Sequence, residues 1–471
     1  MLRRLTASLL LCVTAGCMTV GPNYERPKVE VAEAWQGEVG GPVPAQWWHS
    51  YNDAVLDRMV DEALAHNYDL AAAFARVEEA QAVLGITRAD QLPTVTAQAG
   101  ASRNRFSATR ALAFPGQPLY FNDFNASLQA TWEIDLWGKY RRATEAARAD
   151  LLAARWNREA IRLSLIAQVA QSYFNLRALD AQVAVARETI ATRQSSLELQ
   201  RLRLKAGLAS QFEIDQLQAE TAAAQSLLPA LETQLAQQET ALGVLLGRSP
   251  RALVQTVPDR GAAIEALTIP PGVPSGLPSH LLERRPDLRQ AEERLIAANA
   301  RIGVARAAYY PSISLTGLLG VESISLSDLF TTDSLFWQAG GSLAQTVFDA
   351  GRTKSQVGVA TARQKQMLAE YQSTVQNAFR DTLDALVAQR KANETLQAEQ
   401  TRVTALTSAL QLAKMRYERG IASQLDVLDA ERGLLDAQLN RVTAQRAQLA
   451  ASADLYKALG GGWTAEGVAA D

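Results

Sequence analysis

The sequence contains two copies of one pattern, and this repetition restricts the possible folds more than any other feature. When the sequence is aligned with itself at an offset of 218, the region beginning at Asp69 matches a later region without a gap, and further along the offset becomes 213. A period this long indicates two copies of a whole supersecondary unit, because solenoid repeats are about 20–50 residues long. We therefore predict an internally duplicated chain. The matched pairs include Asp69 with Asp287, Gly85 with Gly303, Pro93 with Pro311, Gly207 with Gly420, and Gly247 with Gly460.

Both copies are predicted to contain a helix, a β-hairpin and two long helices joined by a turn. The first copy covers residues 51–247, with the hairpin at about 94–136 and the long helices at about 139–206 and 210–247. The second covers residues 279–459, with the hairpin at about 312–348 and the long helices at about 352–419 and 424–459. Residues 17–50, 248–278 and 460–471 hold no sustained periodicity and are predicted to be irregular segments outside the repeats.

Apolar and polar residues alternate along the predicted strands. From Phe124 to Leu136 each even-numbered residue is apolar and each odd-numbered residue is polar, which is typical of a strand with one apolar and one wet face. A tilted strand needs about 9–11 residues to cross a bilayer, so this one is long enough. The ranges 94–102 and 312–322 also alternate, apart from Leu318, whereas 337–347 alternates more weakly. A half-buried sheet outside a membrane would show the same alternation.

Two hairpins supply four strands, and four strands cannot close into a barrel by themselves. An open sheet edge is not tolerated in lipid, so a membrane barrel would require several chains. Two chains would supply eight strands and three chains twelve. The strand pattern does not decide between them.

The segments after the hairpins carry a heptad pattern. After Gly138 no proline occurs until Pro229, which is predicted to kink its helix. A helix over 139–206 would be on the order of 100 Å long at ~1.5 Å per residue. Residues at alternating steps of four and three form a seam along it. The seam consists of Leu165, Val169, Ser172, Leu176, Leu179, Val183, Ala186, Ile190, Arg193, Leu197, Gln200 and Leu204.

The N-terminus has the features of a bacterial export signal. Arg3 and Arg4 precede an apolar stretch that is too short to span a bilayer, and small residues stand directly before Cys17. Residues 1–16 are therefore predicted to be a signal peptide. Cys17 is the predicted lipidation site, because its context is similar to a lipobox in spite of Thr14. The residue after it is Met18 and not the aspartate of an inner-membrane retention signal, which favours the outer membrane.

Motifs of common catalytic sites are missing from the sequence. It has no GxxxxGK[ST] phosphate loop, no GxSxG elbow and no HExxH pair, and His49, His66 and His280 are far apart. The formal net charge of −2 gives no basis for nucleic-acid binding. We therefore predict neither an enzyme nor a cofactor or metal site.

Several motifs that follow one another along the chain resemble a single family. They are GPNYERP at 21–27, the pair Trp47-Trp48, LGVLLGRSP at 242–250, LERRPDLRQAE at 282–292, and YKALGGGW at 456–463. Together they are similar to the TolC-type outer-membrane factors, in particular to the lipoprotein (NodT/OprM-like) branch that pairs with resistance-nodulation-division efflux pumps. The resemblance implies a mainly α-helical homotrimer with a twelve-stranded β-barrel in the outer membrane and an α-barrel of long helices in the periplasm. The irregular segments would form an equatorial collar.

The resemblance also implies a function. The chain would be the outer-membrane channel of a tripartite efflux system, and it would passively conduct drugs or other small toxic compounds from a periplasmic adaptor and an inner-membrane pump to the exterior. Type I protein secretion is the alternative within the family, and a periplasmic coiled-coil scaffold is the alternative outside it. No motif identifies the substrate, the pump or the adaptor.

The candidate site residues follow from the same resemblance. Leu425 would form a hydrophobic constriction of the periplasmic aperture, Asp429 a ring of three carboxylates, and Arg432 a bond between neighbouring helices. Each of these three could equally be an ordinary residue of a helix surface. The adaptor would dock on two tips that include Arg203, Gly207, Ser210, Arg416, Gly420 and Ser423.

Overall fold

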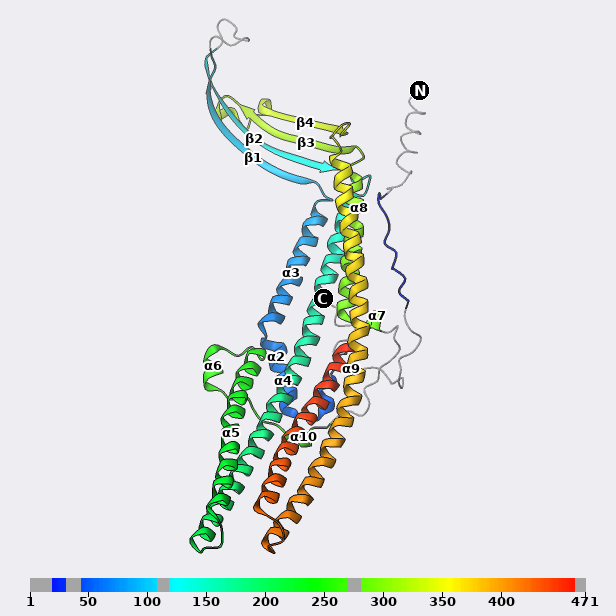
Figure 1. The fold of residues 1–471 in the computed structure, drawn as a ribbon. Helices are drawn as coiled ribbons and strands as arrows, with labels where there is room; N and C mark the ends of the chain where they lie inside the picture. Colours follow the sequence, from blue (N-terminus) through cyan, green and yellow to red (C-terminus); the bar gives the residue numbers. More distant parts are fainter. Residues whose placement is uncertain (1–18, 31–43, 108–117, 269–280, 462–471) are drawn as a thin grey trace. The chain divides into compact units, whose positions relative to one another are not determined.

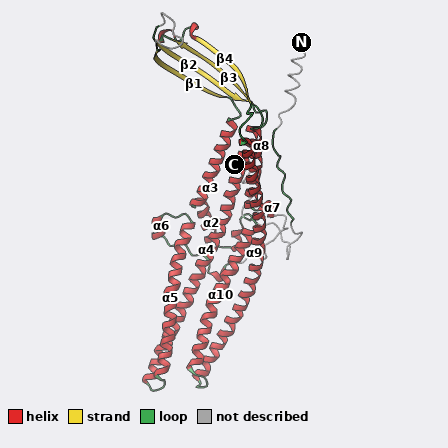
Figure 2. Ribbon diagram, turned by 45° about the horizontal axis from the view of Figure 1, so that its top comes forward, coloured by secondary structure: helices red, strands yellow, loops and turns green. Residues whose placement is uncertain are grey.

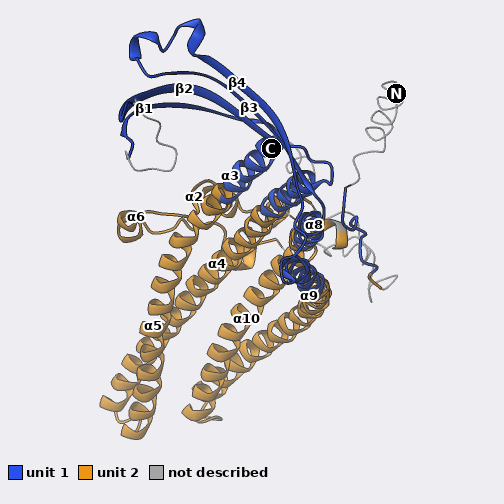
Figure 3. Cartoon of the chain, turned by 90° about the horizontal axis from the view of Figure 1, so that it is seen from above, with its two compact units in different colours: residues 1–28, 76–154, 291–371 blue, residues 29–75, 155–290, 372–471 orange. Residues whose placement is uncertain are grey.

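The structure, a computed structural model, describes residues 19–30, 44–107, 118–268 and 281–461. The chain divides into two compact units (Figure 3). Unit 1 comprises residues 1–28, 76–154 and 291–371, and unit 2 comprises residues 29–75, 155–290 and 372–471. Each unit contains segments of both predicted copies.

The order of elements in the first half of the chain is repeated in the second half (Figure 1). Helix α3 (Tyr68–Ala89) and strand β1 (Thr94–Arg105) match α8 (Pro286–Ala307) and β3 (Ser312–Ser323) at both ends, at the first offset of the sequence alignment. Helices α4 (Lys139–Lys205) and α5 (Gln211–Leu245) match α9 (Arg352–Glu418) and α10 (Gln424–Ala458) at both ends, at the second offset. Strands β2 (Tyr120–Glu133) and β4 (Leu335–Ala344) complete the hairpins. This agreement between elements and sequence match supports an internal duplication.

Shorter elements occupy the remaining described segments. The turn η1 (Trp47–Tyr51) and helix α2 (Ala54–His66) precede α3. Helix α6 (Pro250–Gln255), turn η2 (Ile264–Ala266) and helix α7 (Leu281–Arg284) lie between α5 and α8. Turns η4 (Leu326–Asp328) and η5 (Thr332–Ser334) connect β3 to β4. Among the helices of the described ranges, none combines the length and the hydropathy that a membrane-crossing helix needs.

The four strands form one antiparallel sheet of unit 1 in the order β1-β2-β3-β4 (Figure 2). Residues that stand opposite one another on neighbouring strands share a face of the sheet. One face is apolar and the other is mainly polar, with Phe121, Leu318 and Phe336 among the apolar residues on the polar face. An apolar row across the sheet contains Ala97, Leu128, Leu319 and Trp337, and the next row contains Thr96, Gln129, Leu318 and Gln338.

The bounds of the strands differ from the predicted ones where alternation fails. β2 begins at Tyr120 and not at Phe124, because backbone pairing continues while Phe121 and Asn122 stand in the reverse phase. Period-two patterning cannot detect a strand across such a reversal. β2 ends at Glu133, after which the chain turns into α4 and Asp135 accepts the backbone N–H of Arg141 at 2.8 Å. β4 spans Leu335–Ala344, where alternation predicts 337–347.

A large core of unit 2 surrounds the aromatic residues that precede α2. Trp47, Trp48 and Tyr51 are fully buried and pack against residues of α4, α5 and α10. The ring of Trp47 stacks on that of Tyr456, with centroids 5.0 Å apart, and the Tyr51 hydroxyl lies 2.7 Å from Oγ of Ser452. Large aromatic side chains bury about 150–250 Å² each, so these contacts tie the segment before α2 firmly to the end of α10.

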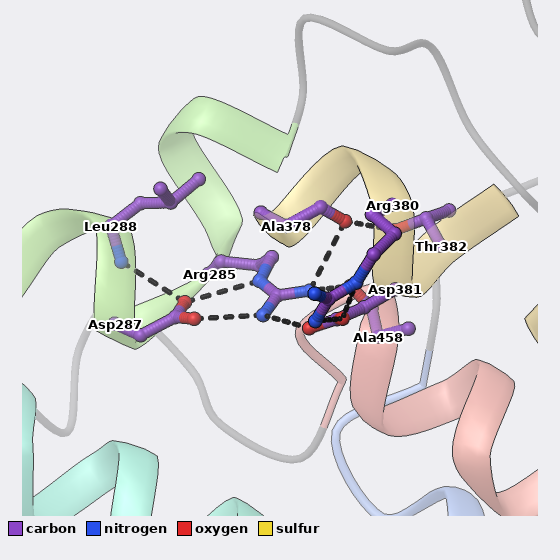
Figure 4. A network of polar contacts seen from close by, with 8 residues as sticks. All are labelled: Arg285, Asp287, Leu288, Ala378, Arg380, Asp381, Thr382 and Ala458. Carbon is purple, nitrogen blue, oxygen red and sulfur yellow. Dashed lines mark hydrogen bonds and ion pairs between the residues drawn. The ribbon is translucent and has the colours of Figure 1, made fainter. Parts of the chain in front are cut away.

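A buried arginine joins separate segments of unit 2 (Figure 4). Nε and Nη2 of Arg285 donate to the two carboxylate oxygens of Asp287 at 3.1 and 2.7 Å. Nη1 donates to the carbonyl of Ala458, the last residue of α10, at 3.1 Å and to that of Ala378 in α9 at 3.4 Å. Arg285 therefore links the start of α8 to the middle of α9 and caps the C-terminus of α10.

Candidate functional site

The helical hairpins α4–α5 and α9–α10 end, within unit 2, in turns of the same geometry (Figure 1). Gly207 and Gly420 have φ angles of +74° and +70°, a region that side chains with a Cβ rarely adopt. The Leu208 N–H donates to the carbonyl of Arg203, and the Ile421 N–H donates to that of Arg416, both at 2.8 Å. These 6→1 bonds form Schellman C-caps at the ends of α4 and α9, for which glycine is the favoured residue.

The helices that follow the turns begin with matching capping boxes. Ser210 Oγ accepts the backbone N–H of Glu213, whose carboxylate in turn accepts the N–H of Ser210 at 2.7 Å. Ser423 and Asp426 make the same exchange at the start of α10. Hydrogen bonds from the side chain and then the backbone of Ser423 lower the pKa of the Asp426 carboxyl. Both predicted tips are therefore turns closed by local hydrogen bonds.

Exposed apolar side chains occupy equivalent positions around the two tips. Each position of the first hairpin has an apolar counterpart at the matched position of the second, and all of these side chains are between 46% and 78% exposed. The two tips therefore present similar apolar surfaces in the described chain. The pairs are Leu199 with Leu412, Leu202 with Met415, Leu208 with Ile421, and Phe212 with Leu425.

The three predicted aperture residues lie on one face of α10, at intervals of four and three residues. Leu425 is 48% exposed, and the side chains of Asp429 and Arg432 are also exposed. Arg432 Nη1 lies 3.4 Å from Oδ1 of Asp429, and its Nη2 bonds Oε1 of Glu220 in α5. The hydrogen bond to Glu220, followed by the attraction of that carboxylate, raises the pKa of Arg432. The structure thus joins the predicted charged pair to a residue of the other hairpin.

Sequence reasoning missed Glu220 and its second partner, Arg193 of α4. Arg193 Nη1 donates to the backbone carbonyl of Glu220 at 2.6 Å and lies 3.5 Å from its Oε2. The sequence does contain one signal for this contact, because Arg193 stands in the heptad seam, where an apolar residue is usual. A charged residue at a seam position must find a buried partner.

A second contact between the hairpins lies nearer the tips. The Gln200 side-chain amide, which is buried, donates to the Tyr417 hydroxyl at 2.5 Å and to Oε1 of Gln424 at 3.0 Å. The guanidinium of Arg203 lies 5.8 Å from the centroid of the Tyr417 ring. Beside these residues, Leu428 of α10 packs in one apolar cluster with Leu197, Ile214 and Leu217. The α9–α10 hairpin is therefore attached to α4 and α5 by both polar and apolar contacts.

The predicted lipidation site, Cys17, lies outside the described residues. The described chain begins at Thr19, and a Cβ placed on Gly138 would come within 2.7 Å of the Thr19 methyl group. The Val20 N–H donates to the carbonyl of Trp137 at 2.9 Å. The described segment that follows Cys17 is thus held at the junction of β2 and α4. In the described ranges, no group of three or more His, Cys, Asp or Glu side chains is arranged to hold a metal ion.

Comparison with known proteins gives consistent results. The sequence profile of the family described as outer membrane efflux protein matches residues 59–248 and 277–461. The cation efflux system protein CusC of Escherichia coli is 33% identical over 458 residues, which are 95% of this chain and 96% of CusC. The pyoverdine export outer membrane protein OpmQ of Pseudomonas putida is 35% identical over 98% of this chain and 97% of its own.

A solved structure extends the similarity to three dimensions. The crystal structure of the Campylobacter jejuni CmeC outer membrane channel is similar to this chain with a TM-score of 0.89 at 28% identity. The match covers 94% of this chain and 95% of that one. The similarity therefore includes the sheet and both long helical hairpins.

Proposed function

Because the chain belongs to the outer membrane efflux protein family, and so to channel proteins of the outer membrane and not to enzymes, we propose that it is the outer-membrane duct of a tripartite efflux system. Three copies would form the duct. Cargo would pass through it passively, because the energy for transport would be supplied by the pump in the inner membrane.

The observation that carries this proposal is the sheet with one apolar face, one polar face and two open edges. Leu128 and Leu319 are about half exposed and Trp337 is 73% exposed, although all three are large apolar side chains. In a closed barrel this face would contact lipid, and the mainly polar face, with the row of Thr96, Gln129, Leu318 and Gln338, would line a water-filled pore. Twelve strands from three copies would remove the open edges at β1 and β4. The choice of three chains over two rests on the family resemblance.

The proposed periplasmic aperture lies at the residues of α10 that contact α5. Arg432 of each copy, bonded to Glu220 and Asp429, would hold the α9–α10 hairpin against the α4–α5 hairpin. The positions that correspond to Asp429 and Arg432 in the first hairpin are Gln216 and Ala219, so the charged pair occurs once per chain. Three copies of Asp429 around one axis would concentrate negative potential on the opening, and Leu425 would narrow it.

The proposed partners are a periplasmic adaptor and a resistance-nodulation-division pump of the inner membrane. The matched apolar residues around the two tips support adaptor docking, because one kind of adaptor surface could use both hairpins of a chain in the same way. Leu208 and Ile421, which are 78% and 63% exposed, directly follow the turn glycines and would be central to this surface.

The cargo is proposed at the level of a class, small toxic compounds including drugs. CusC and OpmQ carry names that refer to cations and to pyoverdine, and their identities to this chain are almost equal at 33% and 35%. Selection of the cargo would therefore take place in the pump.

The lipid anchor is proposed at Cys17. A Cys17→Ser variant is expected to lose incorporation of labelled palmitate, while the wild type incorporates it. Continued labelling of the variant would contradict the anchor and leave the channel proposal unaffected.

The experiment that tests the duct is single-channel recording of the purified protein in planar bilayers. The wild type is expected to conduct poorly, and an Asp429→Ala, Arg432→Ala double variant is expected to conduct well, because it lacks the bonds to Glu220 and the ring of carboxylates. A Gln216→Ala, Ala219→Gly variant changes the corresponding positions of the first hairpin and should behave as the wild type. If confirmed insertion yields discrete conductance for neither the wild type nor the double variant, the duct is refuted.

A further inference from the structure

A buried arginine stands behind the exposed residues of the proposed aperture. The side chain of Arg193 is 2% exposed and that of Glu220 is 19% exposed, whereas that of Arg432 is 52% exposed. Arg193 holds Glu220 at two points, the backbone carbonyl at 2.6 Å and the carboxylate at 3.5 Å, while the other carboxylate oxygen bonds Arg432. In the described part of the chain, Glu220 is the one acidic residue within ion-pair distance of Arg193.

Exposed ion pairs alone would hold the two hairpins together only weakly. A pair such as Arg432 with Asp429 contributes little in water, because two long side chains lose rotamer freedom and salt screens their attraction. A carboxylate that is already oriented by a buried guanidinium loses less freedom when it binds a second cation. The strength of the Arg432 contact therefore depends on what holds Glu220.

The pair of Arg193 and Glu220 is specific to the first hairpin. The matched positions of the second hairpin hold Leu406 and Gly433, and a Cβ on Gly433 would lie 3.4 Å from the side chain of Leu406. The second hairpin thus packs at these positions through apolar contact and without a buried ion pair. Burying a charge here has a cost that the equivalent hairpin avoids, which points to a role other than joining α4 to α5.

Another carboxylate that lines the same cavity as Arg193 is already paired. Arg193 and Glu431 line the same cavity of about 180 Å³ between α4, α9 and α10. Glu431 pairs with Lys414 of α9 at 2.9 Å. Lys414 therefore keeps Glu431 within its own hairpin and leaves the link between the hairpins to Glu220.

We propose that Arg193 is a positioning residue for the ion pair between Glu220 and Arg432 that holds the aperture closed. It fixes the carboxylate of Glu220 in the place where Arg432 binds it. This inference rests on the proposed function, since it concerns the same aperture. Arg193 does not need to contact the pore, because it acts through Glu220.

The test combines single and double variants in planar-bilayer recordings. Arg193→Met removes the charge and keeps an apolar stem in the seam, and Arg193→Lys keeps the charge but loses the guanidinium, whose Nη1 makes both contacts with Glu220. Arg187→Met is the matched control, because Arg187 also joins α4 to α5, through Glu232 at 2.7 Å, but its side chain is 64% exposed. Arg432→Ala is expected to raise the open probability about tenfold, the factor that corresponds to ~1.4 kcal/mol.

If Arg193 positions Glu220, Arg193→Met raises the open probability about as much as Arg432→Ala, and the double variant is no more open than either single one. Arg193→Lys should restore part of the closure, and Arg187→Met should leave both the wild type and the Arg432→Ala variant unchanged. A general loosening of the helices would instead give additive effects, and additivity overturns the inference.

The outcomes separate the two proposals. If Arg432→Ala opens the channel but Arg193→Met closes as tightly as the wild type, the positioning role is wrong and the aperture stands. If Arg432→Ala itself leaves the conductance unchanged, the aperture assignment fails, and the positioning role fails with it.

Discussion

At the scale of single residues, Gly85 and Gly303 show how two matched positions acquire different surroundings. A Cβ on Gly303 of α8 would lie 2.6 Å from the carbonyl oxygen of Val20 and 2.8 Å from Cγ of Arg142, whereas a Cβ on Gly85 of α3 would meet nothing within 4 Å. The segment that begins at Thr19 comes close to the backbone of α8 at Gly303, and nothing comes equally close at Gly85 of α3. Glycine is therefore needed at position 303, because the backbone of Val20 leaves no room for a Cβ. Position 85 has room for one.

This difference leads to a prediction for two equivalent substitutions. Gly303→Ala is expected to destabilise the protein by about 1–3 kcal/mol through overpacking against Val20, and to make residues 19–28 more sensitive to protease. Gly85→Ala is expected to be neutral or to stabilise the protein by up to ~1 kcal/mol, because alanine has a higher helix propensity than glycine and its Cβ would meet no other atom here. Thermal unfolding followed by circular dichroism checks both. Equal melting temperatures for the two variants would show that the close approach does not matter.

Arg285 provides a second prediction at this scale. Arg285→Ala leaves the carbonyl of Ala458 and the carboxylate of Asp287 without their guanidinium donors, and should cost about 2 kcal/mol or more. Arg380→Ala removes a 63%-exposed arginine that bonds Asp381, a carboxylate that Arg285 also reaches, and should cost less than about 1 kcal/mol. Chemical denaturation of the detergent-solubilised protein measures which of the two variants loses more free energy of unfolding. A larger loss for Arg380→Ala would contradict the capping role of Arg285.

At the scale of elements, the strands are defined by which face each residue occupies. Leu128 and Gln129 are neighbours on β2 but belong to the apolar and the polar row of the sheet. A lysine at position 128 would face lipid in the proposed barrel, at a cost of about 2–4 kcal/mol near the middle of the membrane, whereas a lysine at 129 would face water. Leu128→Lys is therefore expected to lower the amount of folded protein in the outer membrane, and Gln129→Lys is expected to leave it near the wild-type level.

Heat-modifiability on gels after outer-membrane fractionation measures this difference. Equal losses for the two variants would mean that both faces meet the same surroundings, which a barrel does not permit.

At the scale of the whole molecule, the chain has edges that it cannot satisfy alone. β1 and β4 are twelve and ten residues long, and each has one strand neighbour in the described sheet. Their outer hydrogen-bonding groups need partners in lipid. We expect the detergent-solubilised protein to have the mass of three chains of 51.0 kDa less their signal peptides, measured by light scattering with the detergent contribution subtracted. A stable mass of two chains would favour the eight-stranded closure instead.

Much of the fold follows from the sequence by local rules. The matched helices and strands, the turns at Gly207 and Gly420 and the two faces of the sheet depend on the backbone freedom of glycine and on short periodic patterns. Each of these properties acts over a few neighbouring residues and is visible in the printed sequence. The family was also recognisable from its motifs, and the comparisons confirm it. The roles of Leu425, Asp429 and Arg432 came from that resemblance, and the role of Cys17 came from its similarity to a lipobox. All four stay predictions.

The tertiary structure alone decided which residues meet across elements. Glu220 was one of many glutamates until α10 brought Arg432 to one side of its carboxylate and α4 brought Arg193 to the other. Phe121 joined a strand against its alternation because β1 offered paired backbone groups there. Glu220 and Arg432 are far apart in the sequence, and no local pattern encodes the register between helices at such a separation. The register is set by packing along the whole length of the helical seams. This packing forms only when the two hairpins have folded against each other.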